Sequence, residues 1–153
     1  MKSKKAFTLL ELLLVIIILG VLSSLITSNF FTSLKKGRDA KRKGDLEQIQ
    51  RALELYYEDK KAYPTSLNFD QSLTDNETGK VYMQKIPNDP SNGNYYYQSD
   101  GTYYKIYACL ENNQQILPYI SNPTNFSCNN TCKDSQGNNV SCIWGISSSN
   151  VSP

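Results

Sequence analysis

The sequence predicts an α+β protein in which one long N-terminal helix packs on a small antiparallel sheet. The stretch before Pro64 holds no proline and only three glycines, so helix-breaking residues are nearly absent from it. Further along, two tyrosine-rich runs flank the pair Asp100-Gly101, which is a signal for a β-hairpin. A sheet this small is not stable alone, so we expect it to need the apolar face of the helix.

The first part of the predicted helix, residues 7–34, is expected to be a transmembrane and assembly segment. The stretch Leu12–Leu34 carries no charge. As a helix it would span roughly 35 Å, enough to cross a hydrocarbon core of ~30 Å. A cleaved secretory signal has a shorter apolar core that a small-residue cleavage site follows. We therefore expect a retained anchor, preceded by a basic leader at residues 1–6.

The second part of the helix, residues 35–60, is predicted to be amphipathic and to continue into the globular body. Leu46, Ile49 and Leu53 recur at steps of three and four residues, and charged residues occupy the other positions. We expect the helix to end near Lys60, since the residue before Pro64 is driven out of helical geometry.

Residues 61–153 are predicted to form a small β-rich domain with a cysteine-containing tail. We interpret residues 64–94, rich in Asn, Asp, Ser, Pro and Gly, as a connecting loop. The hairpin is expected to pair Tyr95–Gln98 with Thr102–Leu110. Two further short strands are expected around Gln115–Leu117 and Val140–Trp144.

All four cysteines lie in the last third of the chain: Cys109, Cys128, Cys132 and Cys142. An even count in a loop-rich segment beyond a membrane anchor favours disulfides in an oxidising compartment, with three pairings open. Reduced cysteines or a zinc site are the alternatives, although the spacing lacks the close Cys-x2-Cys pairs typical of zinc. The chain has no histidine, and no nucleophile–base pair is evident, so we expect no catalysis, no metal and no cofactor.

Glu11 is unusual because it places a carboxylate at the start of the apolar segment, where a charge is costly. One interpretation puts it at the membrane edge, facing water. The other begins with Ala6: a peptidase that cut after this small residue would give Phe7 a positively charged amino terminus. The carboxylate of Glu11 would suit that charge, on the same chain or on a neighbour, and would then fix the offset between chains.

The segment KKAFTLLELLLVIIILGVLSSL resembles the N-terminal signal of type IV prepilins and type II secretion pseudopilins. The resemblance implies a pilin-like fold and cleavage between Ala6 and Phe7 by a membrane prepilin peptidase, which also N-methylates Phe7. Thr8 matches the family's usual Ser/Thr. Glu11 matches the glutamate that meets the N-terminal amine of the adjacent subunit during assembly. The departure is Ala6, where the family most often has glycine.

The resemblance continues more weakly downstream, where RDAKRKGDLEQIQRALELYYEDKKAYP and KIPNDPSNGNYYYQSDGTYYKIYACLE are similar to the major-pseudopilin-like group. That group often binds calcium after the hairpin. Here Glu111 is the only carboxylate in the segment that follows, so we do not expect the calcium site. Asp134 lies in a turn-like segment, KDSQGNN, which we interpret as solvated rather than as a cation site.

The resemblance implies a structural subunit of a type IV pilus-like filament, with a type II secretion pseudopilin as the alternative. From another class, a single-pass, membrane-tethered binding module is the rival. The partners implied are the prepilin peptidase, copies of the chain and other pilins, an inner-membrane assembly platform and membrane lipid. The body would lie on the exterior face of the cytoplasmic membrane and then in a periplasmic or extracellular filament. The positive-inside bias taken alone favours the opposite orientation, but the leader motif and the cysteines override it.

Six basic residues follow the apolar segment: Lys35, Lys36, Arg38, Lys41, Arg42 and Lys43. We favour a solvated helix segment that faces lipid headgroups. Ion pairs with neighbouring subunits are a second interpretation, since Asp39, Asp45 and Glu47 lie nearby. DNA binding is the least favoured, because no aromatic residues interleave with the basic ones for base stacking.

Overall fold

The computed structural model describes residues 7–91, 93–118 and 123–153, without the side chains of residues 25–29. The fold is α+β, as predicted: one long helix, α1, is followed by short strands. The chain forms two compact units, Met1–Lys35 and Lys36–Pro153. Ala6, the expected residue before the cleavage point, lies outside the described residues.

Helix α1 runs from Leu9 to Lys60. Its end agrees with the prediction: Lys61 adopts a left-handed conformation with φ of 56°, and its N–H donates to the carbonyl of Tyr57 at 2.7 Å. This geometry closes the last helical turn and directs the chain back toward the sheet. Among the residues described, we find no helix with the length and apolar character that a membrane crossing requires. The predicted span over residues 7–34 includes residues 25–29, whose side chains lie outside the described set, and it stays a prediction.

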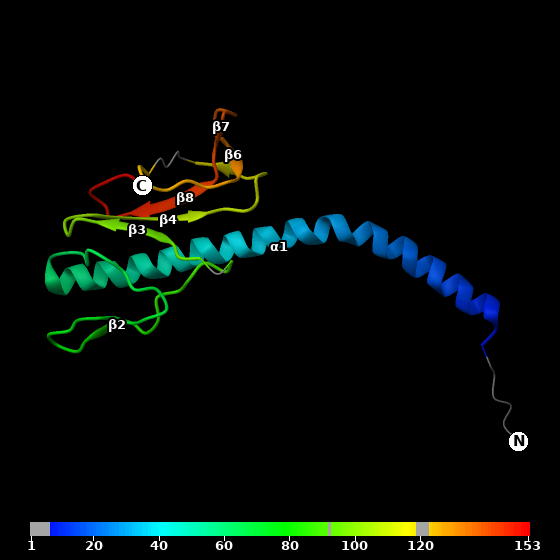
Figure 1. Ribbon diagram of the computed structural model, residues 1–153, viewed down its shortest axis with the longest axis horizontal. Coiled ribbons are helices and arrows are strands. Elements are labelled where there is room, and N and C mark those ends of the chain that lie inside the picture. The colour runs from blue at the N-terminus through cyan, green and yellow to red at the C-terminus, as the bar shows by residue number, and fades with distance from the viewer. Residues whose placement is uncertain (1–6, 92, 119–122) are drawn as a thin grey trace, which may run out of the picture. The chain divides into compact units, whose positions relative to one another are not determined.

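The second unit is built on a three-stranded antiparallel sheet in the order β3-β4-β8. These strands are Tyr96–Ser99, Tyr104–Cys109 and Ile143–Ser147. Strands β3 and β4 form the predicted hairpin, with Tyr96 opposite Tyr107. The last strand, β8, comes from the tail and pairs along the full length of β4. Within this unit the sheet lies on one side of α1 (Figure 1).

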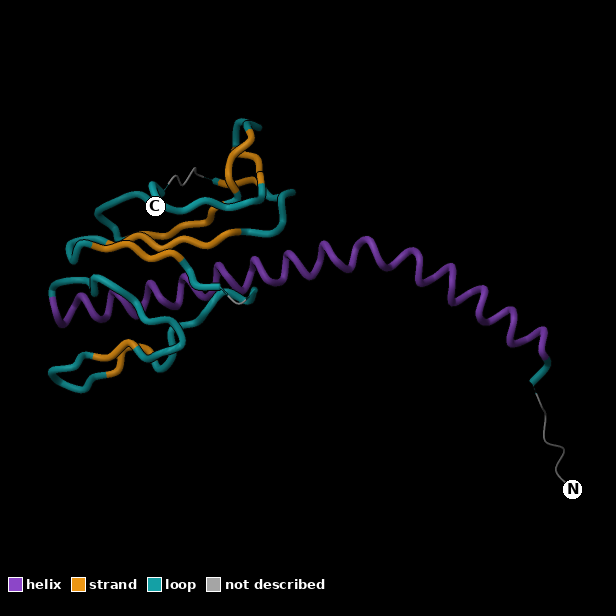
Figure 2. Tube along the Cα trace, in the orientation of Figure 1, coloured by secondary structure: helices purple, strands orange, loops and turns teal. Residues whose placement is uncertain are grey.

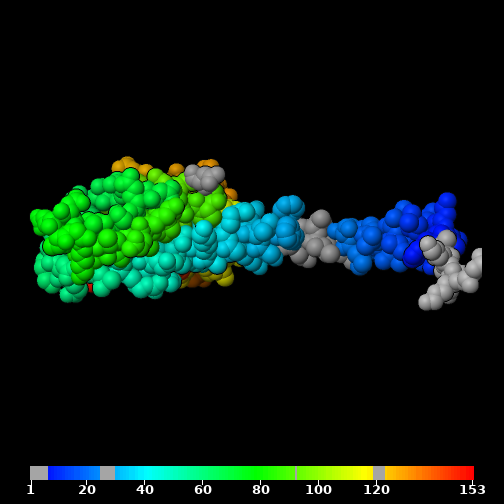
Figure 3. Space-filling model, turned by 90° about the horizontal axis from the view of Figure 1, so that it is seen from below, coloured from blue at the N-terminus to red at the C-terminus, as the bar shows by residue number. Residues whose placement is uncertain are grey.

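The main core lies between this sheet and the helix. The three predicted core positions of α1, Leu46, Ile49 and Leu53, are at most 1% exposed. They share one cluster with Tyr104 and Ile106 of β4. Fully burying a side chain of this kind contributes about 1.5–3 kcal/mol to the free energy of folding. The sheet is too small to be stable alone, so it depends on the side chains that it buries together with the helix. Part of the surface of α1 in this unit stays exposed (Figure 3, cyan).

The interpretation of residues 64–94 as a simple connecting loop was wrong. This segment contains a second hairpin, formed by β1, Leu73–Thr74, and β2, Val81–Met83. The hairpin lies on the other side of α1 from the main sheet (Figures 1 and 2). Its turn is built by Asp75, whose carboxylate accepts hydrogen bonds from the Glu77 N–H and the Thr78 hydroxyl. Strands this short carry no readable alternation, so the turn chemistry was their only signal.

The tail forms a third small sheet in the order β5-β6-β7, from Ile116–Leu117, Thr131–Asp134 and Asn139–Ser141. Strand β5 appears where a strand around Gln115–Leu117 was predicted. The single strand predicted over Val140–Trp144 was wrong in its extent, because the chain leaves β7 before Cys142 and enters β8 after it. Cys142 is fully buried and held by a disulfide, so it fixes this change of sheet.

Candidate functional site

The start of α1 is closed by a reciprocal pair of hydrogen bonds between Thr8 and Glu11. The Thr8 N–H donates to Oε2 of Glu11 at 3.4 Å, and the Glu11 N–H donates to Oγ1 of Thr8 at 3.2 Å. The carbonyl of Thr8 accepts the first helical hydrogen bond, from Leu12, so Thr8 is the N-cap. This arrangement is a capping box, and it satisfies two backbone donors that the helix itself leaves unpaired.

The capping box gives Glu11 a partner within its own chain. An N-terminal amine was the partner that the sequence suggested for Glu11, and this contact with Thr8 was not predicted. The pattern Thr-x-x-Glu before an apolar run was the signal that could have shown it. Both residues are exposed, as is Phe7, whose side chain is 81% accessible.

The first unit exposes apolar side chains on every face of its helix. Between Phe7 and Leu22, all of the large aliphatic and aromatic side chains are exposed; examples are Leu10 at 76% and Ile16 at 58%. A helix that is apolar on all sides needs an apolar environment, because isolated folded proteins rarely expose a continuous apolar surface of this extent. Other helices or lipid tails would provide one.

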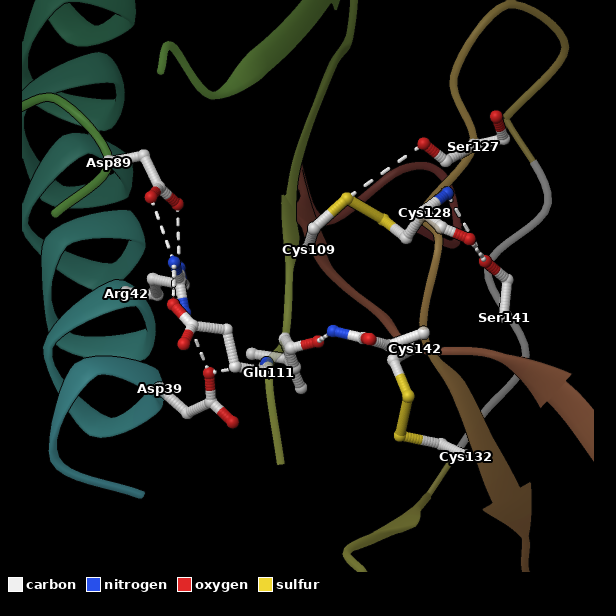
Figure 4. Close-up of a disulfide and its surroundings, with 12 residues drawn as sticks. Asp39, Arg42, Asp89, Cys109, Glu111, Ser127, Cys128, Cys132, Ser141 and Cys142 are labelled. Atoms are coloured by element: carbon white, nitrogen blue, oxygen red, sulfur yellow. Dashed lines mark hydrogen bonds and ion pairs between the residues drawn. A yellow bond between two sulfur atoms is a disulfide. The ribbon is translucent and has the colours of Figure 1, made fainter. Parts of the chain in front are cut away.

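In the second unit, the most heavily bonded side chain is that of Arg42, on α1 (Figure 4). It is 3% exposed and pairs with three carboxylates. Its Nε lies 2.6 Å from Asp89, its Nη1 lies 2.8 Å from Asp39 and its Nη2 lies 2.7 Å from Glu111. Nη2 also donates to Oγ of Ser91 at 2.8 Å. One guanidinium thus connects α1 to the loop before β3 and to the loop after β4.

Asp39, one turn before Arg42, holds the loop after β4 through backbone contacts. Its Oδ1 accepts the N–H of Glu111 at 2.8 Å, and its Oδ2 accepts the N–H of Asn112 at 2.9 Å. Arg38 adds a second guanidinium to Glu111, with Nε at 2.9 Å from Oε1. The loop that follows β4 is therefore anchored to α1 by charge-assisted hydrogen bonds, which are stronger than hydrogen bonds between neutral groups.

The charges in this cluster shift each other's ionisation. Hydrogen bonding from Arg38, and then from Arg42, lowers the pKa of Glu111 to about 2, against the opposing effect of burial. Burial also opposes ionisation of Asp89, but the bonds from Arg42 and Ser91 outweigh it and lower the pKa of that carboxyl. All three carboxylates act as hydrogen-bond acceptors for a permanently charged guanidinium, and the cluster has the character of a structural anchor rather than of proton-transfer chemistry.

This geometry corrects the favoured interpretation of the basic segment as a solvated helix face. Arg42 is buried, and Arg38 pairs with Glu111. Lys43 donates to Gln115 at 3.0 Å and lies 4.3 Å from the ring centroid of Trp144. Half of the basic residues therefore act inside their own unit. The sequence suggested ion pairs between subunits that involve Asp39. In the structure, Asp39 pairs with Arg42 of its own chain.

The two candidate cation carboxylates are also engaged inside the chain. Glu111 faces two guanidinium groups, whose positive charge opposes a metal ion at the same oxygens. Asp134 shapes the turn between β6 and β7: its Oδ1 accepts the N–H groups of Gln136 and Asn138 at 2.8 Å each, and its Oδ2 accepts the Asn138 side chain. Within the described part of the chain, no group of three His, Cys, Asp or Glu side chains is arranged to hold a metal ion.

The four cysteines form two disulfides, Cys109–Cys128 and Cys132–Cys142. This selects one of the three pairings that the sequence left open. The outer disulfide, Cys109–Cys128, is half-buried and joins the end of β4 to the segment before β6. The inner disulfide, Cys132–Cys142, is at most 1% exposed and joins β6 to the residue before β8. Together they fasten the tail to the main sheet (Figure 4).

Comparison with known proteins places this architecture in a family. Residues 1–27 match the profile of the prokaryotic N-terminal methylation motif. Residues 29–115, more than half of the chain, match the profile of type II secretion system (T2SS) protein G. The chain belongs to the T2SS protein G family. The prepilin-type resemblance and its major-pseudopilin-like character are thereby confirmed.

Curated protein G relatives cover most of the chain at moderate identity. The type II secretion system core protein G of Pseudomonas aeruginosa is 30% identical over 110 residues, which are 66% of this chain and 78% of the relative. Its counterpart in Klebsiella pneumoniae is 31% identical over 115 residues, 69% of this chain and 82% of the relative. That of Vibrio cholerae serotype O1 is 30% identical over 109 residues, 66% and 75% of the two chains. No solved structure matches the chain.

The protein G profile ends at Gln115, and this boundary divides the second unit. The part of α1 from residue 29 onward, the β1–β2 hairpin, the β3–β4 hairpin and all three carboxylates of the Arg42 cluster lie inside the matched region. Strands β5 to β8 and three of the four half-cystines lie beyond it. In this protein G family member, the tail thus completes the sheet through β8 and is locked there by disulfides.

Proposed function

We propose that this chain is a pseudopilin, a subunit of the filament of a type II secretion system. The observation that carries the proposal is the protein G match over the body, next to the methylation motif at the N-terminus. From the sequence alone, a type IV pilus subunit was the first prediction and the pseudopilin the alternative. Both use the same N-terminal motif, so only the body discriminates between them, and its relatives favour the pseudopilin.

In this proposal a prepilin peptidase cuts between Ala6 and Phe7 and methylates the amine of Phe7. The exposed apolar side chains described for residues 7–24 and 30–34 pass from lipid into a bundle of the same segments from other copies and from other pilins. The inner-membrane assembly platform drives this transfer. Packing between the helices supplies much of the association energy, since lipid tails are as apolar as leucine.

Glu11 has two successive partners in this scheme. Before assembly it accepts the N–H of Thr8, so its carboxylate is not left bare in an apolar environment. In the filament, the charged amine of a neighbouring Phe7 replaces that weak, 3.4 Å bond with a charge-assisted one. The replacement favours one axial offset between copies and therefore sets the register of the filament.

The body acts as a structural part and not as an enzyme. Its buried charged side chains hold the fold, since Asp39 and Arg42 form the anchor and Asp75 and Asp134 build turns. Its two disulfides suit an oxidising compartment outside the cytoplasm. We therefore place the body on the exterior face of the cytoplasmic membrane, with a periplasmic filament after assembly.

The test is gene deletion and complementation in the organism that makes the chain, with two separate readouts. Deletion should abolish release of secreted enzymes into the medium and leave surface pili unchanged. Complementation with Glu11→Leu should restore neither release nor filaments, although the chain reaches the membrane. Loss of pili with normal release would instead support the type IV pilus. Full function of Glu11→Leu would support the tethered binding module.

A further inference from the structure

The solvent-facing side of α1 in the second unit divides into two surfaces of opposite charge. Positions 36, 37, 40, 41 and 44 lie on the same side of the helix as positions 47, 51, 54, 55 and 58, opposite the buried core residues. We name the first set the basic surface: Lys36, Gly37, Ala40, Lys41 and Gly44. We name the second set the acidic surface: Glu47, Arg51, Glu54, Leu55 and Glu58.

The basic surface is open and closely approachable. Lys36 and Lys41 are exposed, in contrast to Arg38, Arg42 and Lys43, which bind within the unit. Between the two lysines the helix presents only small residues. Beyond the local helix backbone, a Cβ added at Gly37 or at Gly44 would meet no described atom within 4 Å. Another element can therefore come close to the helix backbone here, while the lysines reach around it.

The acidic surface forms one wall of a groove of about 900 Å³. The opposite wall consists of Ile146 and Ser147, at the end of β8, and of Ser149, two residues beyond it. Leu55 is 58% exposed in this groove. Three carboxylates and one guanidinium line the helical wall, so the groove combines an apolar floor with net negative charge. A lysine fits such a site, because its stem packs on apolar surface while its ammonium meets carboxylates.

We propose that the basic surface of one copy docks in the acidic groove of the next copy along the filament. The charges are complementary, and the small residues of one surface face the protruding Leu55 of the other. The two surfaces are centred about 13 residues apart on α1, which corresponds to an axial offset of about 20 Å between parallel copies. The contact joins two different surfaces, so it is heterologous and repeats without closing, as a helical filament requires.

This inference rests on the proposed function, because it needs copies that assemble in parallel. It adds a contact made by the body to the bundling of the N-terminal segments. It also gives Lys36 and Lys41 a role that the structure of one chain does not. The occupant of the groove is a second copy of this chain.

Charge reversal in the full-length chain tests the docking. One variant carries Lys36→Glu and Lys41→Glu, and a second carries Glu47→Lys and Glu58→Lys. Glu54 is left unchanged, because it accepts the hydroxyl groups of Tyr63 at 2.9 Å and Tyr104 at 3.0 Å. Glu58 has only a 3.5 Å ion pair with Lys61, in which both side chains are more than 70% exposed. Reversal at these exposed positions should leave the fold intact.

A matched control and a combined variant complete the series. The control, Lys105→Glu with Lys133→Glu, changes the net charge as the first variant does, but on β4 and β6. The combined variant carries all four reversals of the two test variants and restores complementarity with opposite signs. Periplasmic filaments are released by opening the cell envelope, collected by ultracentrifugation and quantified, together with the total amount of the chain and its disulfides, which report folding.

We expect each test variant to yield about tenfold fewer filaments, and the combined variant and the control to yield wild-type amounts. Unchanged filament yield in both test variants would overturn the docking proposal, as would failure of the combined variant to recover. Normal filaments with lost enzyme release would also overturn it, because the surfaces would then bind another component. If the wild-type chain forms no filament, the proposed function itself fails, and the docking proposal fails with it.

Discussion

Replacement of Arg42 by methionine would remove a guanidinium that is 3% exposed and leave its three carboxylate partners in place. Asp39 would keep the N–H groups of Glu111 and Asn112, and Glu111 would keep Arg38. Asp89, whose side chain is 12% exposed, would keep only Ser91. Removing one partner of a buried ion pair costs about 3–5 kcal/mol, because an uncompensated charge stays buried. We predict this loss in the free energy of unfolding.

The matched control is Arg38→Met, because Arg38 binds one of the same carboxylates but is 39% exposed. We predict a loss of at most about 1 kcal/mol for it. Unfolding of the full chain in detergent, followed in urea through its single tryptophan, Trp144, measures both values. Arg42→Lys should fall between them, since lysine keeps the charge but not the forked geometry. Equal losses for Arg42→Met and Arg38→Met would refute the reasoning.

Three further predictions concern the pH dependence, the disulfides and the core. The depressed pKa of Glu111 means that its stabilising effect is complete above pH 4.5 and is lost as the pH falls toward about 2; Glu111→Gln should flatten melting temperature against pH in that interval, and an unchanged profile would contradict the assignment. Mild reductant should open the outer disulfide before the inner one, since only the inner one is fully buried, as alkylation and mass spectrometry would report; the reverse order would be inconsistent with the burial. Leu53→Ala, at a side chain with no exposure, should cost about 2–5 kcal/mol in the same urea assay, whereas a cost below 1 kcal/mol would mean that the helix and sheet do not share a core.

The parts of the fold that the sequence predicted correctly depend on local signals. The 3.6-residue period of Leu46, Ile49 and Leu53 identified the buried face of α1, and the Asp100-Gly101 pair identified the β3–β4 hairpin. The β1–β2 hairpin was missed because its strands have two and three residues, too few for a pattern. The pairing of β8 with β4 joins residues more than thirty positions apart, and no local signal specifies such a partner.

The candidate site shows the same limit for side chains. Arg42 looks like its basic neighbours in the sequence, but its partners Asp89 and Glu111 are 47 and 69 residues away. Only the folded chain shows that this one guanidinium is buried and the ammonium of Lys41 is not. The capping box of Thr8 and Glu11 is different, because the spacing Thr-x-x-Glu before an apolar run is a local signal that the sequence itself carries.

The most direct test of the central claim is the intact mass and N-terminal sequence of the chain purified from its own cells. Our account predicts a chain that begins at Phe7 and is heavier by one methyl group than the unmodified sequence. That result would establish processing by a prepilin peptidase. A chain that begins at Met1 or Lys2 without methylation would contradict the account, and the membrane-tethered binding module would then explain the protein better.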